Sequence, residues 1–243
     1  MAQFNLKKHI ILENEDFLVI NKPAGISSLH ERISRNTSIL EYVKGINENY
    51  QLCHRIDKYT SGALLVAKHN EAYKHFALQF EKRKINKVYH AVVCGSHRFE
   101  NTEVKAPLTT TRSGKAAINY QKGKDSLTVF NSIENFKHYT LVECKPITGR
   151  LHQIRIHLTM LKSPIAMDVD YGGCVPFLSA IKKGFKIAEG KEEQPMIKRF
   201  ALHAKRLEFK DLKDNLMEVD CPYTKDFSVF LKQLRKYNSL SIL

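Results

Sequence analysis

Short apolar runs separated by polar turns cover most of the chain, and they predict strands more often than helices. HIILENEDFLVINKPAG (9–25) has two such runs joined by the polar ENED, which is typical of two short strands before a Pro-Gly turn. GALLVAK (62–68) is a compact apolar run, as in a strand that is buried on both faces. Further runs predict strands at 87–95, 139–147, 203–209 and 216–222.

Apolar residues at helical spacing predict four helices. Ser38 and Glu41 have the spacing of a capping box, and Gly45 stands where the short helix after them would end. Asn70 is expected to cap a helix that runs to about Lys84. The other two helices are expected within TGRLHQIRIHLTMLK (148–162) and at about 225–237.

The order of these elements predicts the fold class. Because strands outnumber helices and do not alternate strictly with them, we expect an α+β fold with a mixed, largely antiparallel sheet flanked by helices. We expect one domain over residues 1–243, with a core at about 10–222. Polar, Gly- and Ser-rich interruptions, expected to be loops, lie near 95–103, 112–126 and 183–196.

The spacing of the cysteines and the hydropathy of the chain indicate in which cellular compartment the protein is expected. The cysteines are widely and irregularly spaced without a CxxC pair, which argues against a disulfide framework and a structural zinc site. No stretch approaches the roughly 18 apolar residues of a membrane span, and the N-terminus lacks a long apolar core. We therefore expect a cytoplasmic protein that does not enter a membrane. The residues expected to be reduced, mostly buried thiols are Cys53, Cys94, Cys144, Cys174 and Cys221.

The charge balance narrows the class of partner. The formal net charge is +14, and a protein with such an excess of cations tends to bind a polyanion, with nucleic acid as the leading candidate. A basic surface that is merely well solvated is the alternative. The positive residues are spread through folded-looking segments such as EKRKINK (81–87), which suits a groove better than a disordered tail.

One carboxylate stands out as a candidate for chemistry. CHRIDKYTSGALLVAK (53–68) sets Asp57 between Arg55 and Lys58, directly before the predicted buried strand. By one interpretation Asp57 is a turn residue that caps the KYTSG backbone. By the other it is a carboxylate that nearby cations keep ionised, available as a nucleophile or base. Ser61 lacks the GxSxG context of a serine hydrolase.

Other side chains leave both bland and functional interpretations open. His152 and His157 are five residues apart, which places them on different faces of a helix, whereas a helical zinc pair needs a spacing of four. Without a Walker A or GxGxxG motif, no nucleotide cofactor is expected. In TGRLHQIR, His152 and Arg155 share the polar face of the predicted helix, which is either solvated or borders a cleft. Tyr89 fits an ordinary strand aromatic by its local sequence.

Five ordered motifs closely resemble the RluA-type family of RNA pseudouridine synthases, and the match runs from about Ile10 to about Pro222. The most specific one surrounds Asp57, because His-Arg-aliphatic-Asp followed by Thr-Ser-Gly is the hallmark of that family. The motifs are NKPAG, HRIDKYTSGALLVAK, KVYHAVVCG, KPITGRLHQIRIHL and LHAKRLEF.

The resemblance implies an activity and site residues. Uridine in a structured ribosomal or transfer RNA would be detached from C1′, turned and reattached through C5, without metal or organic cofactor. Asp57 matches the essential aspartate of the family, acting as nucleophile or base. Arg155 matches the arginine that pairs with this aspartate. Tyr89 matches the tyrosine that stacks on the target base, and the resemblance leaves open whether it also assists proton removal from C5. The residues expected to contact RNA are His54, Arg55, Arg150 and His152.

The chain also departs from the family pattern. We expect a stand-alone catalytic domain with a central basic cleft and without the S4-type domain of many members, acting as a monomer. Ile56 replaces a usual leucine and Leu151 a usual threonine. SPIAMDVDYGG (163–173) is looser than the family form, although Asp168 and Tyr171 stay in register. The rival hypothesis is a non-catalytic RNA-binding protein that keeps the fold, which would have no need of Asp57, Tyr89 and Arg155 together.

Overall fold

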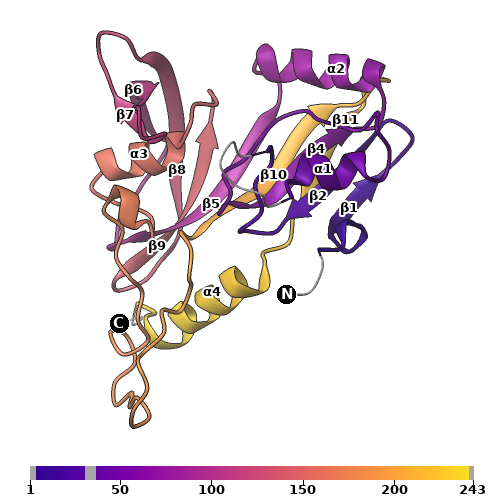
Figure 1. Cartoon of the computed structure of the whole chain (residues 1–243). Coiled ribbons are helices and arrows are strands. Elements are labelled where there is room, and N and C mark those ends of the chain that lie inside the picture. Colours follow the sequence, from indigo (N-terminus) through magenta and orange to yellow (C-terminus); the bar gives the residue numbers. More distant parts are fainter. Residues whose placement is uncertain (1–3, 31–36, 241–243) are drawn as a thin grey trace. The chain divides into compact units, whose positions relative to one another are not determined.

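The computed structural model describes residues 4–30 and 37–240 (Figure 1). The chain forms two compact units. The first unit comprises Met1–Tyr89 and His203–Tyr223, and the second comprises His90–Leu202 and Thr224–Leu243. Strand β5 (Asn86–Cys94) begins in the first unit and continues in the second. The prediction of one catalytic domain over 1–243 stays a prediction.

The first unit is a mixed sheet with two helices. β2 pairs antiparallel with β1 and with β4, β4 pairs parallel with β10, β11 pairs antiparallel with β10, and β3 pairs antiparallel with β4. The strands are predicted correctly apart from the two-residue β3. The elements are η1 (Leu6–His9), β1 (Ile10–Glu13), β2 (Phe17–Lys22), α1 (Ile39–Lys44), β3 (Gln51–Leu52), β4 (Ser61–Ala67), α2 (Asn70–Glu81), β10 (Leu202–Lys210) and β11 (Leu216–Asp220).

Strand β4 is buried along its whole length, as its apolar run predicts. Successive side chains of a strand point to opposite faces of the sheet. Leu65 joins a cluster with Phe76 of α2, whereas Leu64 joins a second cluster with Ile39 of α1. Each face of this strand therefore packs in a core of its own, which explains why GALLVA shows no polar alternation.

Helix boundaries in the first unit follow local capping. Ser38 and Glu41 form the expected capping box. The prediction that Asn70 caps α2 is wrong, because His69 is extended and its ring nitrogen accepts the N–H of Ala72 at 3.3 Å. The helix ends at Glu81, earlier than predicted, and Arg83 then adopts a left-handed conformation with φ of 55°.

The second unit is built on antiparallel strands in the order β9-β8-β6-β7, with β5 beside β9. α3 contacts β6, β7, β8 and β9 (Figure 1). The elements are β6 (Thr102–Thr110), β7 (Ala116–Ile118), β8 (Lys124–Asn135), β9 (Tyr139–Pro146), α3 (Gln153–Met160), η2 (Val169–Tyr171) and α4 (Lys225–Tyr237).

Strands β6, β7 and β8 are missing from the sequence prediction, and 112–126, expected to be a loop, contains β7 and the start of β8. The inward positions of β8 include Ser126 and Thr128, both buried. Polar residues at inward positions hide the apolar alternation that marks a strand. Pro107 inside β6 hides that strand further, since proline is rare in strand interiors.

Helix α4 agrees with its predicted range, 225–237. Its buried face carries Phe227, Phe230, Leu231 and Leu234, and the ring of Phe230 meets that of Tyr139 edge to face at 5.9 Å. No helix in the described ranges is long and apolar enough to cross a bilayer.

The prediction that all five cysteines are free thiols is wrong for Cys94 and Cys174, which form a disulfide. Cys94 ends β5, and its N–H donates to the carbonyl of Pro164 at 2.9 Å. The carbonyl of Cys174 accepts the N–H of Met167 at 2.7 Å. Backbone pairing thus brings together two cysteines that are 80 residues apart in sequence, which spacing rules for short motifs do not detect.

We predict that three cysteines, Cys53, Cys144 and Cys221, react as thiols in the unfolded oxidised protein, and that five react after reduction. Closing a loop of this length is expected to stabilise the fold by about 2–4 kcal/mol. Denaturant unfolding with and without a dithiol reductant measures this difference, and Cys144→Ser serves as the control that leaves the cross-link intact. Five reactive thiols before reduction would contradict the prediction.

Candidate active site

The segment that carries Asp57 is fixed by hydrogen bonds on both sides of this residue. Before it, the hydroxyl of Ser28 donates to the carbonyl of Ile56 at 2.8 Å and accepts the N–H of Ile56 at 3.2 Å. After it, the N–H of Gly25 donates to the carbonyl of Lys58 at 2.8 Å. The carbonyl of Asp57 itself accepts an N–H at 3.1 Å in a tight turn closed by Thr60. The backbone at Asp57 is therefore held while its half-buried side chain remains accessible.

The side chain of Lys22 is fully buried and ties this segment to the end of β2. Its ammonium donates to the carbonyls of Pro23 at 2.9 Å, Ile26 at 2.8 Å and Lys58 at 3.0 Å. These carbonyl oxygens accept the donors of the ammonium and offset part of the cost of burying its charge. Lys22 thus links the NKPAG turn to the residue after Asp57.

The glycine of the Thr-Ser-Gly sequence, at the start of β4, is required by the close approach of the parallel strand β10. Gly62 has φ of +110°, and a Cβ there would lie 2.1 Å from the carbonyl oxygen of Ala204. Only glycine fits such a position without moving the backbone. Next to it, the buried hydroxyl of Ser61 lies 2.8 Å from Nδ1 of His203. This contact gives Ser61 a structural role between β4 and β10.

Tyr89 lies within the electrostatic influence of Asp57. It packs at the edge of the apolar cluster of the first unit that includes Leu65. Burial, and after it the negative charge of Asp57, raise the pKa of the Tyr89 phenol. The phenol therefore stays protonated at neutral pH, where it can stack on a base or donate a hydrogen bond.

His54 and Arg55, both predicted to contact RNA, have different surroundings. Nε2 of His54 accepts the N–H of Leu65 at 3.0 Å, and its ring stacks on Phe80 with centroids 4.6 Å apart. Burial lowers the pKa of His54 to about 3, so the ring is neutral, and the charge of Lys87 adds to this effect. Arg55 is exposed. RNA contacts by these two residues stay predictions.

In the second unit, Arg155 is buried among a carboxylate and two aromatic rings. It pairs with Asp168 through two bonds, from Nε at 2.7 Å and from an Nη at 2.6 Å. Its guanidinium lies over the rings of Tyr171 and Phe200, 4.6 and 4.3 Å from their centroids. Two aromatic rings and two charge-assisted hydrogen bonds together fix the orientation of the guanidinium. The expected pairing of Arg155 with Asp57 stays a prediction.

His152 and Arg150 precede α3, although the sequence placed them in the helix. His152 has φ of 50° and stands at the N-cap, and its Nδ1 lies 2.8 Å from the hydroxyl of Tyr171. Nε of Arg150 donates to the carbonyl of Asp125 at 3.1 Å. His152 therefore orients the tyrosine that covers Arg155, while RNA contacts by His152 and Arg150 remain predictions.

A buried polar network beneath α3 was not foreseen. The side-chain oxygen of Gln153 accepts from the hydroxyl of Thr148 at 2.7 Å, and its nitrogen donates to Thr128 at 2.9 Å. The ring of His157 lies 2.9 Å from the hydroxyls of both Ser126 and Thr128, and burial lowers its pKa to about 4. These bonds attach α3, and with it Arg155, to strand β8.

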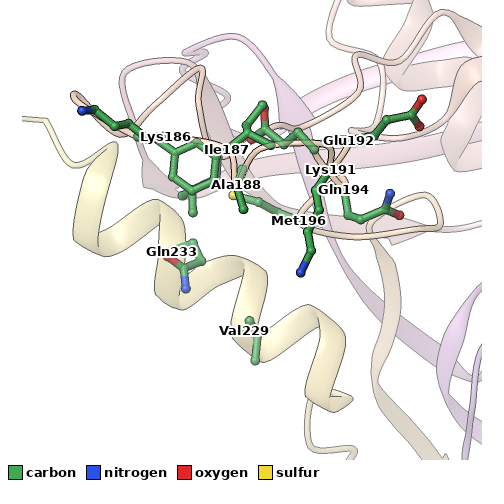
Figure 2. Close-up of a pocket in the computed structure, with 12 residues that line it drawn as sticks. Lys186, Ile187, Ala188, Lys191, Glu192, Gln194, Met196, Val229 and Gln233 are labelled. Carbon is green, nitrogen blue, oxygen red and sulfur yellow. The ribbon is translucent and has the colours of Figure 1, made fainter.

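A pocket of about 360 Å³ lies between α4 and the segment 178–196 (Figure 2). Val229 and Gln233 line it from the helix, and Ile187 and Met196 line it from the segment. None of the predicted site residues lines this pocket. Within residues 4–30 and 37–240, no group of three His, Cys, Asp or Glu side chains is placed to hold a metal ion.

Comparison with known proteins identifies the family. A family model described as RNA pseudouridylate synthase matches residues 16–160. The ribosomal large subunit pseudouridine synthase C of Vibrio parahaemolyticus is 33% identical over 237 residues, covering 96% of this chain and 71% of that protein. The ribosomal large subunit pseudouridine synthase D of Borreliella burgdorferi is 30% identical, with 98% and 72% covered.

The chain belongs to the RNA pseudouridylate synthase family. The predicted family is thereby confirmed, together with an isomerase that acts on uridine in RNA. Two solved human structures share the fold of this synthase. RNA pseudouridylate synthase domain containing 4 has a TM-score of 0.70 at 23% identity, covering 95% of this chain and 94% of that one. Domain containing 1 has a TM-score of 0.68, also at 23% identity, covering 99% and 100%.

The predicted pseudouridine synthase fold is therefore confirmed, whereas the central basic cleft stays a prediction. Sequence reasoning placed the synthase's candidate residues but missed the partners that hold them. Lys22 lies in the family motif NKPAG, but no sequence pattern predicts that its ammonium donates to three backbone carbonyls. Asp168 stays in register with the family pattern, but the pattern does not predict its two hydrogen bonds to Arg155.

We predict that Lys22→Met lowers the turnover of the synthase more than its RNA affinity, because the carbonyls that fix the Asp57 segment lose their donor. Leaving buried carbonyls unsatisfied is expected to cost about 1–3 kcal/mol of stability. Single-turnover rates and denaturant unfolding measure both effects. The exposed Lys44→Met is the matched control. Unchanged turnover in a folded Lys22→Met protein would refute this role.

A second substitution tests the support of Arg155. Asp168→Asn removes the charge that pairs with a buried guanidinium and is expected to destabilise the protein by about 3–5 kcal/mol. Asp170 lies 3.6 Å from the same guanidinium, but its side chain is 48% exposed. Asp170→Asn is therefore expected to cost at most about 1 kcal/mol. Equal unfolding midpoints for the two variants would show that burial of the pair is unimportant.

Proposed function

We propose that this synthase converts specific uridines of large-subunit ribosomal RNA to pseudouridine, with Asp57 as the essential carboxylate. The observation that carries this proposal is the fixed backbone on both sides of Asp57, with the protonated phenol of Tyr89 under its electrostatic influence. The relatives named as ribosomal large subunit synthases support the choice of RNA, since they align with nearly the whole chain. Transfer RNA is the alternative substrate.

The chemistry requires the target base to leave its stack. Unstacking costs a few kcal/mol, and stacking of the freed base on the Tyr89 ring would return about 1–3 kcal/mol of it. Asp57 then acts on the nucleoside, either by attack as a nucleophile or by removal of a sugar proton. Because the phenol of Tyr89 is protonated, it is not the base that takes the proton from C5. The carboxylate of Asp57 would accept that proton in the last step, and N1 of the base, which has lost its bond to C1′, would take up a proton.

Charged residues of both units are proposed to serve this reaction. Arg155, whose orientation is set by Asp168, would pair with Asp57 and align its carboxylate. Exposed Arg55 would contact the RNA that the base has left, together with His54. Arg150 and His152 would contact the RNA backbone. Action as a cytoplasmic monomer without metal or organic cofactor stays a prediction from the sequence.

The test is to incubate the purified synthase with large-subunit ribosomal RNA and with transfer RNA, and to map pseudouridine in each at nucleotide resolution. We expect modification at defined uridines of the ribosomal RNA. Asp57→Asn is expected to lower the single-turnover rate by about 10²–10⁴-fold, as for loss of a group that acts directly on the substrate, with RNA affinity retained. Asp214→Asn, an exposed aspartate of the same unit, is the control.

The possible outcomes separate the parts of the proposal. Full activity of Asp57→Asn would refute the role of Asp57. Modification of transfer RNA alone would refute the proposed substrate. Tight binding of RNA without any pseudouridine would support the rival hypothesis of a non-catalytic RNA-binding protein.

A further inference from the structure

Lys87 shares a strand face with Tyr89. In β5 the two residues are separated by one position, and side chains at alternate positions point to the same side of a sheet. They are therefore about 7 Å apart along the strand. The side chain of Lys87 is half-buried, and its charge acts on the ring of His54, which precedes Asp57 by three residues.

The ammonium of Lys87 has no hydrogen bond or ion pair among the described residues. Two other cations that the fold buries have carboxylate partners, whereas the ammonium of Lys22 has carbonyl oxygens. Lys68 pairs with Glu13 at 2.9 Å, and Arg199 pairs with Asp226 at 2.7 Å. A half-buried cation without such a partner has lost part of its solvation without compensation, so it is available to an anion from outside the protein.

The groups known to act on Lys87 add no negative charge. Arg83, in the left-handed position after α2, contributes a second positive charge. His54 is neutral because its Nε2 accepts a backbone N–H. Burial, and after it the charge of Arg83, lower the pKa of Lys87 to about 8. The cluster of Lys87 and Arg83 thus has the charge and the donors of an anion site.

We propose that Lys87, assisted by Arg83, binds a backbone phosphate of the substrate RNA next to the nucleotide that stacks on Tyr89. This inference rests on the proposed function, because RNA is the anion that this surface meets during the reaction. Binding of the phosphate restores the missing counter-charge and places the adjacent base along β5 toward Tyr89. Lys87 is accordingly a binding and positioning residue and not a catalytic one.

A specific pH dependence follows from this arrangement. Phosphate binding favours the charged form of Lys87, so RNA binding takes up a proton above a pH of about 8. Affinity is then expected to fall by up to about tenfold per pH unit above that value. His54 stays neutral and Tyr89 stays protonated over this range. Lys87 is therefore the member of this cluster that titrates in this range.

The experiment compares Lys87→Ala, Lys87→Gln and Lys87→Arg with Lys84→Ala, which removes an exposed lysine from the same segment. RNA affinity is measured for the whole protein by fluorescence anisotropy against salt concentration and pH. We expect Lys87→Ala and Lys87→Gln to bind about tenfold more weakly, with the slope of log affinity against log salt reduced by about 1. Lys87→Arg is expected to keep affinity and slope but to lose the fall above pH 8.

The outcomes are decisive in both directions. If Lys87→Ala and Lys87→Gln match Lys84→Ala in affinity and salt slope, Lys87 does not bind phosphate. If Lys87→Arg keeps the fall in affinity above pH 8, another group titrates and the inference is wrong. Pseudouridine formation by the wild-type protein is assayed separately, so failure of the proposed function is distinguished from failure of the Lys87 site.

Discussion

The ammonium of Lys22, buried at the end of β2, is the interaction on which the candidate site of the first unit depends. It donates to the carbonyl of Pro23 within the NKPAG turn, to that of Ile26 directly after the turn, and to that of Lys58, the residue after Asp57. A fixed backbone segment serves an enzyme only if the reactive side chain on it stays accessible to the substrate. Here the backbone is bound and the carboxylate is half-buried, so the position of the group is fixed without being covered.

The second unit applies the same principle to a cation. Arg155 receives its orientation from Asp168, Tyr171 and Phe200, and Tyr171 is in turn bound by His152. Helix α3, which carries Arg155, is attached to β8 through the buried hydroxyls that contact His157. Ser126 and Thr128 occupy inward positions of β8 because they contact His157 and so attach α3 to the sheet.

The limits of the sequence prediction follow from the range of each interaction. Apolar periodicity predicts β4 and α4 because their buried residues are apolar and follow one another at strand or helix spacing. It missed β8, since the inward Ser126 and Thr128 are satisfied by a helix some 30 residues away. The motif around Asp57 gave the family and the candidate residues. The Cys94–Cys174 bond and the partners of Lys22 arise from tertiary contacts, which no local pattern records.

Several buried cations of the protein have acceptors within the fold, whereas the ammonium of Lys87 has none among the described residues. Arg155 and Arg199 have carboxylates, and buried Lys22 has carbonyl oxygens. An enzyme that binds a polyanion gains affinity only from cations that its own fold has not already neutralised. Lys87, on the same strand face as Tyr89, is a cation of this kind, so a phosphate that binds there would add to the affinity of the protein for RNA.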